Sequence, residues 1–75
     1  MNILILNCGS SSIKFQISEM PEYKVVIEGS VERVGYDNAE FKYTVKNDKK
    51  SIICPVKNHE EGINLVFNTI LILRF

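Results

Sequence analysis

The stretch NILILNCGSSSIKFQ, residues 2–16, largely determines how the first part of this chain can fold. Asn2 to Leu6 form a continuous apolar run, which is typical of a short strand buried on both faces. Residues 7–11 have the composition of a turn. From Ser12 onward, apolar and polar side chains alternate, which indicates a strand with one buried and one solvated face. We therefore predict a strand, a polar turn and a second strand.

Three further strands are predicted downstream. Residues 23–34 form the third, and Gly29 within it indicates a bulge or a close approach of two backbones. Residues 41–45 alternate in the same way as the second strand and predict a fourth. Residues 47–50 predict a turn, and residues 51–54 predict a short fifth strand.

The apolar period then changes to that of a helix over about residues 59–71. Asn58 followed by Glu61 fits a capping-box-like start. Gly62 weakens this helix by about 1 kcal/mol relative to Ala. From these patterns we expect Lys14 and Ser12 to be accessible, and we expect five side chains to be buried: Phe15, Ile17, Val25, Ile27 and Phe67.

Composition excludes several classes of protein. With 75 residues the chain is one small domain or a part of one, and a chain of this size buries only roughly 60% of its unfolded surface. Nine basic residues balance nine acidic ones without a long block of either sign, so nothing favours nucleic acid or an anionic membrane as a partner. Two cysteines form neither a disulfide framework nor a metal-ligand pair, which favours a reduced, cytoplasmic protein.

Residues 7–14, NCGSSSIK, are the stretch best suited to chemistry. A phosphate group offers only acceptors at neutral pH, so its binding site must supply donors. Gly9 allows close backbone approach, turn N–H groups and serine hydroxyls can donate, and Lys14 adds a positive charge. Asn7 offers a neutral oxygen suited to Mg²⁺ or to its bound water. The pattern is not a Walker A loop, because the turn joins two strands.

Composition alone favours an ordinary polar turn over a phosphate site, since Gly-Ser-Ser-Ser is common between strands. Cys8 is better explained as a small packing residue than as a nucleophile. His59, the only histidine, is better explained as a solvated residue in the first turn of the helix than as a catalyst.

Three segments resemble one family. Residues 2–16 resemble the N-terminal signature of the acetate kinases and the related propionate kinases, whereas butyrate kinases fit less well. Gly29 with residues 32–35 resembles the family's Gly-x-x-Glu-Arg-Ile-Gly segment. Residues 59–66 resemble its following helix, in which Ala usually stands in place of Gly62. The resemblance spans about residues 2–71, and the first motif is highly specific.

The resemblance implies a ribonuclease H-like α/β fold, of the type shared by acetate and sugar kinases and actin. Residues 1–75 would be the N-terminal portion of the nucleotide-binding domain, with about five mainly antiparallel strands and then one helix. The apolar ending of the chain fits an incomplete domain. The family's acyl pocket, transition-state residues and adenosine site would lie beyond this chain, so no catalytic residue is assigned.

The resemblance also implies roles for single residues. Asn7 would hold Mg²⁺, Lys14 would contact ATP, and Ser10 and Ser12 would line the phosphate site. The reaction would be transfer of the ATP γ-phosphoryl group to acetate, with propionate as the alternative substrate. The full-length family member would be a cytoplasmic homodimer, and this chain alone would be inactive. The alternative from a different class is a stand-alone β-rich module that binds an anion or a partner without catalysis.

Overall fold

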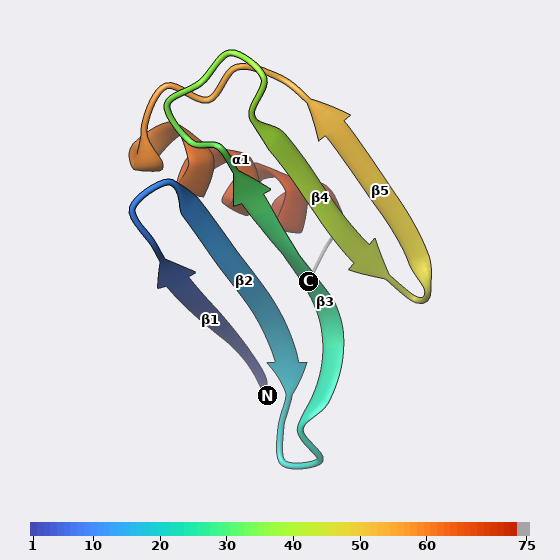
Figure 1. The fold of residues 1–75 in the computed structure, drawn as a ribbon. Helices are drawn as coiled ribbons and strands as arrows, with labels where there is room; N and C mark the ends of the chain where they lie inside the picture. Colours follow the sequence, from blue (N-terminus) through green and yellow to red (C-terminus); the bar gives the residue numbers. More distant parts are fainter. Residues whose placement is uncertain (74–75) are drawn as a thin grey trace.

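Five strands form one antiparallel sheet in chain order, and one helix lies across one of its faces (Figure 1). The computed structural model describes residues 1–73. Strand-forming alternation and the change to a helical period after residue 58 predict this order, and the prediction of five antiparallel strands followed by a helix is confirmed. The elements are β1 Asn2–Cys8, β2 Ser12–Glu19, β3 Lys24–Glu32, β4 Glu40–Val45, β5 Asp48–Ile53 and α1 His59–Leu73.

The core lies between the helix and the middle of the sheet. Alternate residues of β2, β3 and β4 point to this side, where the ring of Phe41 is tilted against those of Phe15 and Tyr43 at centroid distances of 6.1 and 5.2 Å. The predicted burial of Phe15, Ile17 and Ile27 is confirmed. The core consists of Ile13, Phe15, Ile17, Ile27, Val31, Val34, Ala39, Phe41, Val56, Val66 and Ile70.

The prediction that the first strand is buried on both faces is wrong. β1 is the first strand in the sheet order and pairs only with β2, while the helix lies behind β2, β3 and β4 (Figure 1). Ile3, Ile5 and Leu6 are 39%, 43% and 36% exposed as a result. A continuous apolar run indicates a strand, but it does not say what covers that strand.

The predicted burial of Val25 is also wrong, because a bulge interrupts the alternation of β3. Ile17 pairs with Ile27, whereas the next residue of β2, Ser18, pairs with Val25, so Val26 is an extra residue on β3. Strict alternation would put Val25 and Ile27 on one face. The bulge moves Val25 to the other face, where it is 43% exposed. The predicted feature at Gly29 is the close backbone approach, since Gly29 pairs regularly with both neighbouring strands.

Phe67 is 40% exposed, so its predicted burial is wrong as well. The helix presents a narrow stripe to the sheet, with Gly62, Val66 and Ile70 buried at intervals of four residues. Phe67 lies one position beyond this stripe. The helical period predicted the helix correctly, but the predicted apolar face was wider than the face that packs against the sheet. Over residues 1–73, no helix is long and apolar enough to cross a membrane.

The turn between β4 and β5 is shorter than predicted. Val45 pairs with Asp48, so Lys46 and Asn47 alone make the turn, and β5 begins at Asp48 instead of residue 51. Both turn residues have positive φ angles, 51° and 69°, as a two-residue type I′ turn requires. Such turns match the twist of the strands that they join, so this turn fixes the register of β5 on β4.

Gly62 brings the helix close to β2, directly beside the turn between the first two strands. A Cβ atom on Gly62 would lie 2.6 Å from Cδ1 of Ile13. That atom is the end of a side chain that can rotate, and Ala gains about 1 kcal/mol of helix propensity over Gly. We therefore expect Gly62→Ala to change the free energy of unfolding by less than about 1 kcal/mol in urea denaturation. A loss of several kcal/mol would show that Ile13 cannot move.

Candidate functional site

The turn between β1 and β2 is held in one shape by its own backbone. Cys8 pairs with Ile13, and the N–H of Gly9 donates to the carbonyl oxygen of Ser12 at 2.8 Å. A Cβ atom on Gly9 would lie only 2.9 Å from Oγ of Ser12. That hydroxyl is the end of a short side chain that can rotate, and Ser10 and Ser11 are exposed at the tip of the turn.

Two contacts from distant parts of the chain fasten this turn. The N–H of Val34, in the loop after β3, donates to the carbonyl oxygen of Ser11 at 2.9 Å. Nε2 of His59, the first residue of α1, donates to the carbonyl oxygen of Gly9 at 2.7 Å. The interpretation of His59 as a solvated first-turn residue missed this bond, and nothing in the sequence joins residues 50 positions apart.

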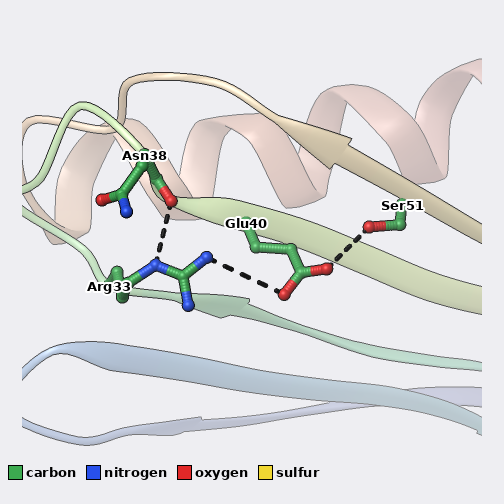
Figure 2. A network of polar contacts seen from close by, with 4 residues as sticks. All are labelled: Arg33, Asn38, Glu40 and Ser51. Atoms are coloured by element: carbon green, nitrogen blue, oxygen red, sulfur yellow. Dashed lines mark hydrogen bonds and ion pairs between the residues drawn. The ribbon is translucent and has the colours of Figure 1, made fainter.

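The loop that carries Val34 is itself supported by a polar network (Figure 2). Nε of Arg33 donates to the carbonyl oxygen of Asn38 at 3.0 Å, and its Nη2 lies 4.0 Å from Oε1 of Glu40. Oγ of Ser51 donates to Oε2 of Glu40 at 2.8 Å. An ion pair this exposed contributes between about 0 and 1 kcal/mol. We infer that the network mainly sets the path of the loop and so the position of Val34.

The start of α1 is capped, which places His59 in a defined position. Oδ1 of Asn58 accepts the N–H of Glu61 at 2.9 Å, and Oε1 of Glu61 accepts the N–H of Lys57 at 3.1 Å. The predicted capping-box-like start is therefore confirmed, with the glutamate reaching one residue further back than in the usual box.

The face of the sheet opposite the helix carries a row of polar residues. Strand register places one residue from each strand in this row: Asn7, Lys14, Ser30, Lys42 and Ser51. Paired residues of neighbouring strands point to the same face, with Cβ atoms about 5 Å apart. Lys14 and Lys42 are two strands apart, about 10 Å, with Ser30 between them. The row begins at the two residues that the sequence proposes for metal and ATP.

This row lies in an open hollow of about 690 Å³. Its lining includes four lysines, Lys14, Lys42, Lys49 and Lys50, and one acidic residue, Glu28. The excess of positive charge favours an anionic ligand. Asn7 and Lys14 also line the hollow, whereas Ser10 and Ser12 are outside its lining.

The four predicted site residues differ in exposure. Lys14, Asn7 and Ser10 are exposed and Ser12 is half-buried, so the predicted accessibility of Lys14 is confirmed. Asn7 and Lys14 are direct cross-strand partners, and Ser12 precedes Lys14 by two residues on the same strand face. Their roles toward ATP and Mg²⁺ stay predictions.

The chemistry of the donors bears on the implied metal. Over residues 1–73, no three His, Cys, Asp or Glu side chains gather in a way that could hold a metal ion. Mg²⁺ in phosphate-transfer sites is often held by one or two protein oxygens together with phosphate oxygens and waters. The exposed carboxamide of Asn7 fits such a site as a single protein ligand, not as part of a cage.

A sequence model of the acetokinase family matches residues 2–74. The chain belongs to the acetokinase family. It is 44% identical over 71 residues to the acetate kinase of Pseudothermotoga lettingae, a match that covers 95% of this chain and 18% of that enzyme.

Two solved structures share the fold. The crystal structure of Porphyromonas gingivalis acetate kinase matches with a TM-score of 0.86 and 31% identity, over 92% of this chain and 18% of that chain. A propionate kinase from Francisella tularensis matches with a TM-score of 0.85 over 93% of this chain, and its 21% identity bears on the fold alone. The chain thus spans about 18% of the length of the proteins that it matches.

Proposed function

We propose that this chain is the phosphate-handling N-terminal portion, residues 1–75, of an ATP- and Mg²⁺-dependent acetate kinase. The complete enzyme would transfer the γ-phosphoryl group of ATP to acetate and release ADP and acetyl phosphate. The observation that carries the proposal is the family membership over residues 2–74, together with 44% identity to an acetate kinase. Independently of the family, the excess of lysines around the hollow supports an anionic ligand.

The proposed roles follow from charge and position. Phosphoryl transfer depends on holding the groups in line and on neutralising charge at the phosphoryl oxygens. Lys14 would place a positive charge on the ATP phosphates from the open face of β2. The hydroxyls of Ser10 and Ser12 would donate to phosphate oxygens. Asn7 would hold the Mg²⁺, whose charge neutralises phosphate oxygens when it is bound.

Other parts of the proposal follow from the family. ATP and a short carboxylate would be the partners, without nucleic acid or membrane. The complete enzyme would act in the cytoplasm as a homodimer. Acetate is proposed over propionate because the propionate kinase likeness concerns the fold alone.

A chimera tests whether this segment can serve the reaction. The part of this chain that matches the P. lettingae acetate kinase over 71 residues replaces the corresponding segment of that enzyme. We expect the chimera to form acetyl phosphate from ATP, Mg²⁺ and acetate, measured by trapping with hydroxylamine. We expect the isolated chain to give only background, because one wall of a cleft neither positions the acyl group nor excludes water.

Two results would contradict the proposal. A chimera that folds but forms no acetyl phosphate, beside an active parent, would favour the stand-alone anion-binding module. Turnover by the isolated chain that disappears in Lys14→Ala would show that the rest of the enzyme is not required.

A further inference from the structure

We propose that His59 is a positioning residue: it turns the Ser10 amide toward the phosphate. This role rests on the proposed function of the turn, but its geometric part stands on the backbone alone. His59 is half-buried, and its Nε2 lies 2.7 Å from the carbonyl oxygen of Gly9. A carbonyl oxygen only accepts, so Nε2 must carry a proton. The contact therefore specifies which ring nitrogen is the donor.

The bond fixes a whole peptide unit. The carbonyl of Gly9 and the N–H of Ser10 belong to the same planar unit, and the cis peptide bond found within residues 1–73 is elsewhere, at Met20–Pro21. In a trans unit the C=O and N–H groups point in opposite directions. With its oxygen directed at His59, the unit must direct the Ser10 N–H away from the helix.

That N–H is available for a ligand. Within residues 1–73 the Ser10 N–H has no protein acceptor, and Ser10 is exposed. Two neighbouring groups of the turn are engaged within the protein: the Gly9 N–H donates to the Ser12 carbonyl oxygen, and the Ser11 carbonyl oxygen accepts from the Val34 N–H. A free, outward N–H in a tight turn is the kind of donor that anion-binding turns present.

The helix start gives this contact its rigidity. Asn58 and Glu61 cap α1 by hydrogen bonds to backbone N–H groups, and Gly62 lets the first turn pack directly on Ile13 of β2. The imidazole is thus carried by an element that is fastened to the sheet next to the turn. Without the bond, the Gly9–Ser10 unit can rotate, and the Ser10 N–H loses its fixed direction.

Two variants of the 75-residue chain separate the bond from the bulk of the side chain. The amide nitrogen of a glutamine can lie near the position of the histidine Nε2. Asparagine is shorter, so its amide nitrogen lies near the position of Nδ1 instead. In NMR spectra of the isotope-labelled chain, we expect His59→Asn to shift the Gly9 carbonyl carbon and the Ser10 amide. We expect His59→Gln to keep both close to their original positions. Asn64→Ala, an exposed change on the same helix, is the control.

Titration with MgATP, followed at the Ser10 amide, tests the function. We expect His59→Asn to weaken apparent binding by up to roughly tenfold, the effect of one hydrogen bond, and His59→Gln to restore it. Equal behaviour of the two variants, or wild-type binding by His59→Asn, would overturn the role. A wild-type chain that shows no MgATP response at residues 10–14 would count against the proposed function. The carbonyl and amide shifts would then decide the positioning role alone.

One measurement needs no variant. A long-range ¹H–¹⁵N spectrum of the wild-type chain should show the proton of the neutral imidazole on Nε2. A proton on Nδ1 would overturn the inference, even if every variant failed to fold.

Discussion

Gly29→Ala is expected to abolish cooperative folding of the chain. A Cβ atom on Gly29 would overlap the carbonyl oxygen of Lys42 on β4, and it would lie 2.8 Å from Cα of Tyr43 and 2.8 Å from Cζ of Phe15. Two of these atoms belong to the backbone of the neighbouring strand. They cannot move aside without breaking the pairing of Gly29 with Tyr43 at the centre of the sheet.

The size of the effect follows from how little stability a chain of this length has. Forcing extra atoms into a packed site costs about 1–3 kcal/mol even where side chains can adjust, and more where they cannot. Native proteins are stable by about 5–15 kcal/mol, and small domains lie at the low end. The gain of about 0.5–1 kcal/mol from replacing a strand glycine does not offset the clash.

Urea denaturation followed by circular dichroism measures this effect, with Gly62→Ala as the matched control. Both changes add one methyl group at a tight glycine, but Gly62 faces the end of a flexible side chain and Gly29 faces backbone. We expect a near-normal transition for the control and none for Gly29→Ala. A Gly29→Ala chain within about 1 kcal/mol of the wild type would show that β3 and β4 are further apart than described.

The order of the elements could be predicted because each element has its own local pattern. Alternation in residues 12–17 and 41–45 and the helical period after Asn58 depend only on neighbours in the sequence. What covers an element depends on partners far away, and there the predictions were wrong. β1 has the composition of a buried strand yet lies at the edge of the sheet, and Val25 is displaced by a single extra residue in β3.

The candidate site likewise has a part that local sequence predicts and a part that depends on long-range contacts. Asn7, Ser10, Ser12 and Lys14 lie within eight residues, so their strand–turn–strand arrangement could be proposed from local sequence. The polar row that extends from Lys14 to Lys42 requires the register of three strands, which the sequence does not supply. The His59 contact requires the position of the helix on the sheet. Both were therefore missed.

Lys14→Ala in the chimera with the P. lettingae enzyme is expected to lower kcat/KM for ATP by roughly 100-fold, the usual effect of removing one group that stabilises transition-state charge. Lys24→Ala removes an exposed lysine at the other end of the sheet, where it pairs with Glu19, and should change little. Steady-state assays of acetyl phosphate formation measure both variants. Equal, small effects would show that Lys14 is an ordinary surface lysine.

Variants of Asn7 in the same chimera separate a metal ligand from a turn residue. If its carboxamide oxygen holds Mg²⁺, Asn7→Ala should have its largest defect at limiting Mg²⁺ and recover partly as Mg²⁺ is raised.

Asn7→Asp adds a negative charge that favours the cation but repels a bare phosphate oxygen, so apparent Mg²⁺ affinity should rise. The rise should be limited, because the new carboxylate would stand opposite Lys14 on the neighbouring strand and pair with it in part. Asn7→Asp combined with Lys14→Ala removes that competitor and should bind Mg²⁺ more tightly than Asn7→Asp alone, although its turnover stays low. Unchanged Mg²⁺ dependence in all three variants would leave Asn7 as a residue that only shapes the end of β1.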